Sequence, residues 1–231
     1  MYWVDAALLT ILWACFTVHW LTLNNVWIVP PQCALWIPAY VEHSVVSLSE
    51  VRLSTVLVEK SAAESLGDHC FIVRISKLLR ELVLRFNQLD HLNSDENSLE
   101  DEIEKSLQLL IFHEIKQASS FPIVIPWPKD SRLIRMCEEL MEHPDNPKDL
   151  NIWADQIGTS SRTLIRLFQK ETGLNYRAWV QQMHIALALG KLSRGESISR
   201  IASTLGYCNS SAFSAMFKKH LGESPQHFRK E

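Results

Sequence analysis

The chain has 231 residues, of which 47% are hydrophobic and 21% charged, a composition that excludes a disordered protein and fits one or two soluble globular domains. Its formal net charge of −3 is unevenly divided: residues 150–231 hold 11 Lys and Arg against 5 Asp and Glu, whereas residues 1–149 hold 12 against 21. A basic C-terminal part indicates a polyanion-binding surface at that end. Five cysteines without a C-x-x-C pair fit neither a disulfide framework nor a zinc ribbon, and they favour a reducing cytoplasm.

Near the N-terminus, no Lys, Arg, Asp or Glu occurs between residues 6 and 41, and residues 6–23 are mostly apolar. This run permits two interpretations, buried β-strands or a membrane segment. We favour strands, because His19 and two asparagines interrupt the run, no basic residue precedes it, and three prolines divide residues 26–41 into short segments. A membrane partner is therefore not expected, although a membrane-tethered protein anchored by residues 6–29 stays an alternative.

Short β-branched or aromatic runs come next, separated by proline, glutamate or serine. They predict the strands of a small sheet. The runs are residues 27–29, 34–37, 44–48 and 51–58.

From Ile75 the apolar residues follow i, i+3, i+4, i+7 spacing, which predicts amphipathic helices over residues 75–89 and 103–117 with an acidic stretch between them. Their apolar faces can pack within one chain or between two chains, so a homodimer stays open. Residues 118–128 hold three prolines and predict an interdomain linker.

The last third contains one helix-turn-helix pattern twice, with turns at Gly158 and Gly206. Equivalent positions are 48 residues apart before the turn and 49 after it, so the second turn has one inserted residue. We expect N-caps at Asp149 or Asn151, Ser160 or Ser161, and Asn209 or Ser210. The apolar equivalents are Ala154 and Ala202, Leu164 and Phe213, Leu167 and Met216, and Phe168 and Phe217.

A long amphipathic helix is predicted over residues 176–194, between the two patterns. At about 1.5 Å per residue it spans roughly 28 Å. A rod of that length can hold the second helices of the two patterns close to one DNA turn apart, roughly 34 Å. One chain could then reach two successive major grooves.

Several segments carry a resemblance to a known family. SSRTLIRLFQKETGL, WVQQMHIALAL, SRIASTLGY and SAFSAMFKKHLGESPQHFR resemble the DNA-binding domain of AraC/XylS-family transcriptional regulators over about residues 130–231. ISKLLRELVL and WIVPPQCALWIPAYVEHSV are similar to the branch of that family with an N-terminal cupin-like β-barrel. The terminal G-x-S-P-x-x-[FY]-R signature occupies Gly222, Ser224, Pro225, Phe228 and Arg229.

The resemblance implies an α+β fold, mostly α, in three parts. We expect a shortened, incomplete cupin-like β domain at residues 1–66, because residues 1–26 match the family poorly. A helical linker or dimerisation region at 67–125 and an all-α DNA-binding domain at 126–231 come after it, the latter with its two helix-turn-helix units joined by a long helix. The implied protein is a cytoplasmic, sequence-specific regulator that binds double-stranded DNA at promoters and contacts RNA polymerase.

The first recognition helix is expected at about residues 161–170. Arg162 and Arg166 are one turn apart, so their guanidinium groups leave the same face, and Arg is well matched to guanine O6 and N7. Phosphate contact or pairing with Glu171 stays an alternative. The candidate DNA-contacting residues here are Ser160, Ser161, Arg162, Ile165, Arg166 and Lys170.

The second recognition helix is expected at about residues 210–219. Its short outward side chains predict positioning more than base recognition, while Lys218 and Lys219 predict phosphate contact or, alternatively, a solvated basic face. In the long helix His184 stands where the family usually has Arg, which puts one contact with the DNA backbone in doubt. The candidates in the second unit are Asn209, Ser210, Ser211, Ser214, Lys218 and Lys219.

Metal-binding cupins need several His and a Glu converging on one point, and this chain offers only His43 in the corresponding region. We therefore expect no metal and no cofactor, and a small-molecule effector stays open. The chain contains no glycine-rich phosphate loop, H-E-x-x-H or G-x-S-x-G, so we expect no enzyme. The remaining alternative, a cupin-type ligand- or partner-binding module with a protein-binding helical tail, is disfavoured by the basic charge of that tail.

Overall fold

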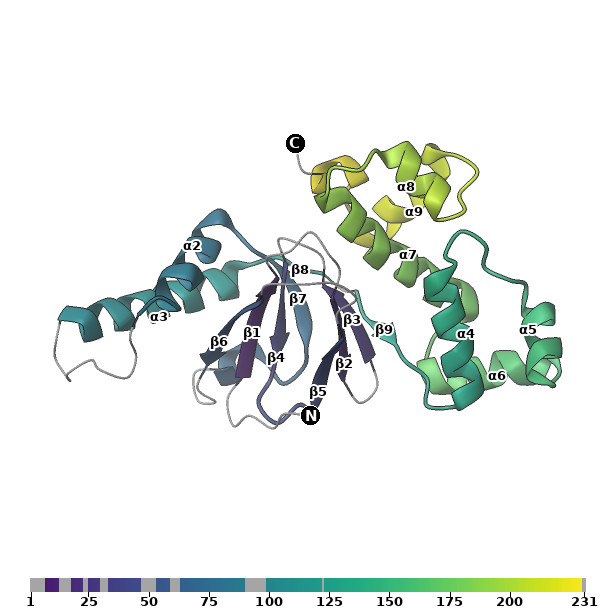
Figure 1. The fold of residues 1–231 in the computed structure, drawn as a ribbon, viewed down its shortest axis with the longest axis horizontal. Coiled ribbons are helices and arrows are strands. Elements are labelled where there is room, and N and C mark those ends of the chain that lie inside the picture. Colours follow the sequence, from purple (N-terminus) through teal and green to yellow (C-terminus); the bar gives the residue numbers. More distant parts are fainter. Residues whose placement is uncertain are drawn as a thin grey trace. The chain divides into compact units, whose positions relative to one another are not determined.

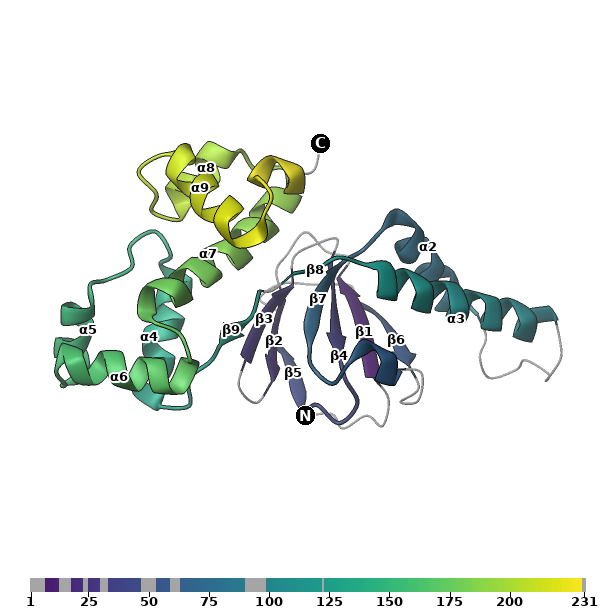
Figure 2. The same ribbon diagram turned by 180° about the vertical axis from the view of Figure 1, so that it is seen from behind.

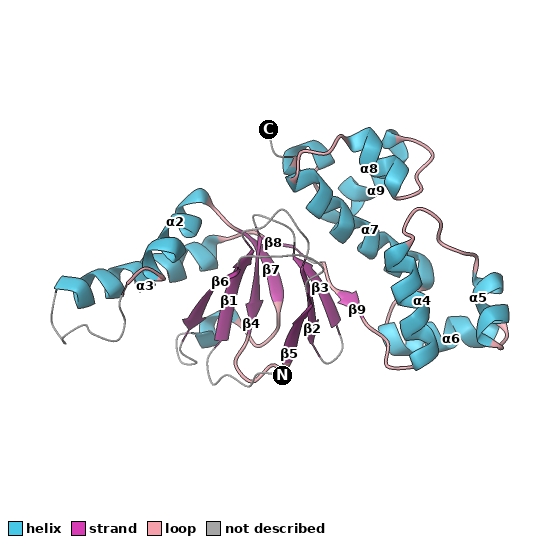
Figure 3. Ribbon diagram, viewed as in Figure 1, coloured by secondary structure: helices cyan, strands magenta, loops and turns pink. Residues whose placement is uncertain are grey.

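The computed structural model describes residues 7–12, 18–22, 25–29, 33–46, 53–58, 63–89, 99–121 and 123–229. A β region occupies the N-terminal part and helices dominate the rest (Figure 3), which confirms the predicted α+β, mostly α class. The chain forms two compact units: residues 1–14, 31–42 and 48–122, and residues 15–30, 43–47 and 123–231. The three-part division at residues 66 and 125 is a different partition, and it stays a prediction.

The first unit contains an antiparallel sheet with the strand order β6-β1-β4-β7-β8. Central strand β4 is buried along its whole length, as its continuous apolar run requires. β1 lies between β4 and β6, with Leu9 opposite both Trp36 and Val56. The strands are β1 (Ala7–Leu12), β4 (Cys33–Ile37), β6 (Leu53–Val58), β7 (Phe71–Arg74) and β8 (Ser120–Phe121).

Two helices of this unit, α2 (Lys77–Phe86) and α3 (Leu99–Gln117), come after the short 3₁₀ turn η1 (Glu64–Leu66). Ser76 begins α2 by accepting the backbone N–H of Leu79, and its hydroxyl donates to Glu114 of α3 at 2.5 Å. Both predicted helices are confirmed, α3 beginning four residues earlier than expected. The core residues include Leu9, Trp36, Leu79, Val83, Ile111 and Ile115.

The second unit contains an antiparallel sheet with the order β5-β2-β3-β9. Its strands are β2 (Val18–Thr22), β3 (Asn25–Val29), β5 (His43–Val46) and β9 (Ile125–Pro126). The apolar N-terminal run thus contributes strands β1 and β2, while residues 13–17 lie outside the described residues. None of the helices in the described parts combines the length and the apolar character that a membrane crossing requires.

The remaining elements of the second unit are helical (Figure 1). Seen from behind in Figure 2, α7 runs between two helical pairs, α5 with α6 and α8 with α9. Trp179 of α7 is fully buried, and its indole N–H donates to the carbonyl of Pro126 in β9 at 2.8 Å. The helices are α4 (Ser131–Glu142), α5 (Leu150–Ile157), α6 (Ser161–Thr172), α7 (Tyr176–Ser193), α8 (Ile198–Thr204) and α9 (Ser210–Leu221), followed by the 3₁₀ turn η2 (Pro225–Phe228).

Candidate nucleic-acid interface

The first helix-turn-helix consists of α5 and α6. Asp149 caps α5 by accepting the N–H of Asn151, and Gly158 ends it in the left-handed conformation at φ 74°. Ser160 then caps α6 by accepting the N–H of Thr163 at 3.2 Å. Caps and turn are therefore where the sequence predicts them, because each is set by the local backbone requirement of one residue type.

Helix α6 buries one face and exposes the other. Leu164, Phe168 and Thr172 are buried, with the ring of Phe168 edge-on to Tyr176 and Trp179 of α7. The opposite face presents Arg162, Ile165, Arg166 and Lys170 to solvent, and Ile165 is 44% exposed. Four of the six candidates in this unit therefore share one accessible face.

The two arginines of this face are available for a ligand. Within the part of the chain that the structure describes, neither Arg162 nor Arg166 has a side-chain hydrogen bond or ion pair. The carboxylate of Glu171, the alternative partner, instead accepts the backbone N–H of Lys129 at 2.9 Å. The guanidinium groups remain unneutralised on the exposed side of α6.

The other two candidates of the first unit have structural partners. The Ser160 hydroxyl lies 2.9 Å from that of Thr163, in addition to its capping bond. The Ser161 hydroxyl donates to Asn151 of α5 at 2.5 Å. Ser161 is half-buried and joins the two helices, whereas the capping Ser160 is exposed.

The second helix-turn-helix, α8 and α9, repeats this construction with one extra residue. The N–H of Thr159 binds the Ala154 carbonyl and that of Tyr207 binds the Ala202 carbonyl, both at 2.9 Å. Because these bonds are equivalent, and because Asn209 caps α9 as Ser160 caps α6, the inserted residue is Cys208. Cys208 is exposed, so the inserted side chain stays outside the core of this helix-turn-helix.

Helix α9 buries Phe213, Met216 and Phe217 and turns short side chains outward. Asn209 and Ser211 are exposed, and Ser210 and Ser214 are half-buried. Lysines 218 and 219 lie exposed in the last turn, where positive charge also interacts favourably with the helix dipole. The second face therefore has polar groups at its start and cations at its end.

Two residues that are not among the predicted DNA contacts, Ser199 and Arg229, lie next to three that are. An open hollow of about 600 Å³ is lined by Ser199 of α8, Arg229, and three candidates of α9. Arg229 belongs to the terminal signature, which was the sequence feature that could have indicated it. The candidates in this hollow are Ser210, Ser211 and Ser214.

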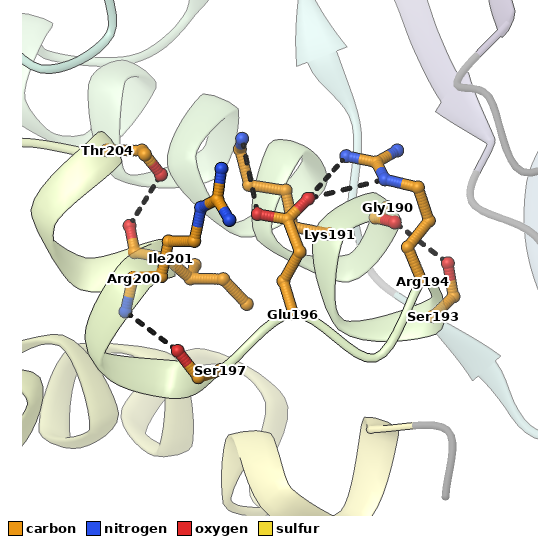
Figure 4. A network of polar contacts seen from close by, with 9 residues as sticks. All are labelled: Gly190, Lys191, Ser193, Arg194, Glu196, Ser197, Arg200, Ile201 and Thr204. Carbon is orange, nitrogen blue, oxygen red and sulfur yellow. Dashed lines mark hydrogen bonds and ion pairs between the residues drawn. The ribbon is translucent and has the colours of Figure 1, made fainter.

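The connection from α7 to α8 is held by a cluster of charges (Figure 4). The Glu196 carboxylate lies 3.0 Å from the Arg194 guanidinium and 3.8 Å from the Lys191 ammonium. Ser197 caps α8 through the N–H of Arg200 at 3.3 Å, and the Arg229 side chain donates to the Gly195 carbonyl at 3.3 Å. These contacts fix the direction in which α8 leaves α7.

His184, which stands where the family usually has Arg, is buried, with 5% of its surface exposed. Its Nε2 lies 2.9 Å from the carbonyl of Pro144, and its Nδ1 lies 3.2 Å from the hydroxyl of Tyr207. A carbonyl only accepts, so Nε2 carries the proton and Nδ1 accepts from Tyr207. Burial lowers the pKa of His184 to about 4, so the imidazole is neutral near pH 7.

Side chains that could bind a metal ion do not gather in the described ranges. His43 is buried in β5, and no three His, Cys, Asp or Glu side chains there lie together as metal ligands would. Glu114, next to His113, accepts the hydroxyl of Ser76. Of the five cysteines, Cys15 lies outside the described ranges; the other four, at 33, 70, 137 and 208, are free thiols.

The sequence of this chain is similar to those of known transcriptional regulators. A family model described as a helix-turn-helix domain matches residues 153–231. The HTH-type transcriptional regulator NimR of Escherichia coli K12 is 35% identical over 202 residues, which cover 87% of this chain and 72% of NimR. RipA of Corynebacterium glutamicum, also an HTH-type transcriptional regulator, is 30% identical over 104 residues, 45% of this chain and 31% of RipA.

Among solved structures, the DNA-binding domain of the global transcriptional factor AdpA in complex with a target DNA is 25% identical. The match covers 42% of this chain and 89% of that domain, with a TM-score of 0.40. ToxT of Vibrio cholerae is 12% identical, and the match covers 98% of this chain and 90% of ToxT, with a TM-score of 0.42.

Proposed function

Because this chain belongs to the AraC/XylS family of transcriptional regulators, we propose that it places α6 and α9 in two successive major grooves of double-stranded DNA. The chain is a DNA-binding transcriptional regulator and not an enzyme. The observation that carries the proposed mode of binding is the exposed face of α6, where Arg162 and Arg166 lie one turn apart.

In this proposal α6 reads bases. The residues near the start of a recognition helix contact base edges, and a guanidinium group can donate two hydrogen bonds to O6 and N7 of guanine. Arg162 lies in the first turn of α6 and Arg166 one turn later, so both face the same stretch of groove. Ser160 and Ile165 flank them, and Lys170, near the end of the helix, reaches a phosphate.

In this proposal the second helix-turn-helix positions the protein on the DNA backbone more than it recognises base sequence. Serine hydroxyls at the start of α9 have little reach into a groove, but with the helix N-terminus they suit a phosphate oxygen. Lys218, Lys219 and Arg229 add positive charge around that face. Affinity from this unit would depend little on sequence.

Further partners are finer proposals. A homodimer is supported by the exposed leucines of α3, among them Leu109, 73% exposed. A small-molecule effector is supported by a largely apolar hollow of about 630 Å³ lined by residues of β6, α2 and α3, a size that suits small ligands. A cupin-like character of the β region, contact with RNA polymerase and a cytoplasmic location are proposed from family membership.

A mobility-shift titration of the full-length chain on random-sequence duplex tests DNA binding directly. Neutralised phosphates release counterions, so the logarithm of the association constant should fall linearly with the logarithm of salt concentration. With six to ten phosphate contacts, affinity drops by about 10³ to 10⁵ between 50 and 200 mM salt. Binding that is absent, or insensitive to salt, would contradict the proposal.

A further inference from the structure

The short loop of residues 144–148, between α4 and α5, contacts both helix-turn-helix units. In Figures 1 and 2 it extends from the end of α4 toward the turn between α8 and α9. Pro144 and Pro147 fix two of its φ angles, which makes the loop stiff. We call these five residues the brace loop.

One end of the brace loop, at Lys148, is attached to the first helix-turn-helix. The carbonyl of Lys148 accepts the hydroxyl of Tyr176 at 2.9 Å, and the same hydroxyl receives the indole N–H of Trp153 at 3.3 Å. The ammonium group of Lys148 lies 4.7 Å from the Trp153 ring and pairs with Glu139 of α4. Lys148 therefore joins α4, α5 and the start of α7.

The other end of the brace loop contacts the turn between α8 and α9, in the second helix-turn-helix. A Cβ placed on Gly206 would lie 2.1 Å from the backbone oxygen of Asp145, so the two backbones touch. Next to this contact, His184 of α7 binds the Pro144 carbonyl on one side and the Tyr207 hydroxyl on the other. The Tyr207 ring in turn packs edge-on against Phe213 of α9, with 5.5 Å between ring centroids.

We propose that the brace loop and His184 set the spacing between α6 and α9, with His184 as the positioning residue. The proposal rests on the two-groove function above. The Glu196 cluster attaches the second helix-turn-helix at the end of α7. An attachment at one end still permits rotation about that end, whereas a second contact away from it removes this freedom. The brace supplies this second contact, running from Trp153 through Lys148 and Pro144 to His184 and Tyr207. It would make the protein discriminate between DNA sites by the distance between their two elements.

Two glycines give a matched pair of variants. Gly158 and Gly206 both hold left-handed turns, at φ 74° and 75°, so an alanine strains either turn similarly. Nothing lies within 4 Å of a Cβ on Gly158, whereas one on Gly206 would collide with the brace loop. Gly206→Ala should therefore displace the brace, and Gly158→Ala controls for turn strain.

The first measurement needs no DNA. In the full-length chain, non-canonical amino acids that carry spin labels replace the exposed Gln169 in α6 and Ala215 in α9. Double electron–electron resonance then gives the distribution of distances between the two labels. Gly206→Ala and His184→Leu should broaden this distance distribution, whereas Gly158→Ala should leave it as narrow as in the wild type. His184→Gln should also keep it narrow, because the glutamine amide can donate to the Pro144 carbonyl. Equal distributions in all variants would overturn the brace.

The second measurement uses a duplex selected by the wild-type chain from a random library. One base pair inserted between its two contacted elements should weaken wild-type binding by about tenfold, and the His184→Leu variant clearly less. An equal penalty for both chains contradicts the proposal. If the wild type binds no duplex, the two-groove function is wrong, but the distance measurement still tests whether the brace loop sets the spacing between α6 and α9. If circular dichroism shows Gly206→Ala unfolded, His184→Leu decides it alone.

Discussion

The arginines of α4 and α6 differ in whether a carboxylate of the same chain already pairs with them. The Arg132 guanidinium donates to both oxygens of Asp130, at 3.0 and 2.8 Å, and this hydrogen bonding lowers the pKa of Asp130 to about 2. Arg162 and Arg166 have no such carboxylate among the described residues. An arginine whose guanidinium already pairs with a carboxylate of the same chain has fewer free donors for DNA. We therefore expect DNA recognition from α6 and not from the start of α4.

Replacing Arg162 by Ala should reduce affinity for the preferred duplex by about 1–3 kcal/mol and relax the choice of base at one position. Lys218→Ala, the comparison variant, should weaken all sequences alike and lower the salt slope by about 1, because it removes a phosphate contact. Titrations on selected and scrambled duplexes check both. The same loss on both duplexes for Arg162→Ala would assign that residue to phosphate.

The buried imidazole of His184 makes stability depend on pH. Burial lowers its pKa to about 4, and the hydrogen bond to Pro144 acts in the opposite direction. In the unfolded chain the imidazole titrates near its ordinary value of about 6.5. Between these values only the unfolded chain binds the proton, so the free energy of unfolding should fall as pH drops from about 6.5 to 4, by roughly 3 kcal/mol.

Urea unfolding of the full-length chain at intervals from pH 7 to pH 4 checks this expectation. The His184→Gln variant keeps a donor for Pro144 but has no imidazole to protonate. Its unfolding free energy should decline less over the same interval. A decline as steep as that of the wild type would mean that other groups cause the acid sensitivity.

Among the helices, the start of α6 combines a structural and a binding role in Ser160. Ser160→Ala should cost about 1 kcal/mol of stability, because the N–H of Thr163 loses its cap. Ser160→Asp retains a capping oxygen and adds a charge that suits a helix N-terminus, so its stability should match the wild type. Its DNA affinity should nevertheless fall, since the carboxylate would face phosphates.

Thermal unfolding and mobility shifts on the same two proteins separate the roles of Ser160. Wild-type DNA affinity in the Asp variant would place the start of α6 away from the nucleic acid. The equivalent exchange of the second cap, Asn209→Asp, provides the comparison for α9, which the proposal also places against phosphate.

For the chain as a whole, the distance between two helical units decides what DNA it can bind. Helix α7, with 18 residues, spans about 27 Å. The first helix-turn-helix packs near its start, through Phe168 on Trp179, and the second begins at its end, where Glu196 pairs with Lys191 and Arg194. Hydroxyl-radical footprinting of the full-length chain on its selected duplex should therefore show two protected patches on one face, about 10 base pairs apart. A single protected patch would mean that only one unit enters the groove.

The sequence alone indicated the helices of residues 150–221, the turns at Gly158 and Gly206, and, to within two residues, the N-caps of α5, α6 and α9. Apolar spacing fixes which face of a helix is buried, and a residue such as Gly158, Ser160 or Asn209 meets a backbone requirement of its own position, so neither depends on distant residues. The repeated pattern and the terminal signature likewise sufficed to assign the family.

The tertiary structure alone decided which distant residues meet. The short strands β8 and β9, within the predicted linker, exist because they pair with β7 and β3. Their sequence has no periodicity of its own to predict them. Ser161 joined to Asn151, Arg229 beside the serines of α9, and His184 between Pro144 and Tyr207 are likewise set by packing across the chain. Periodicity tells which face of an element is buried, but only the packed chain determines what that face meets.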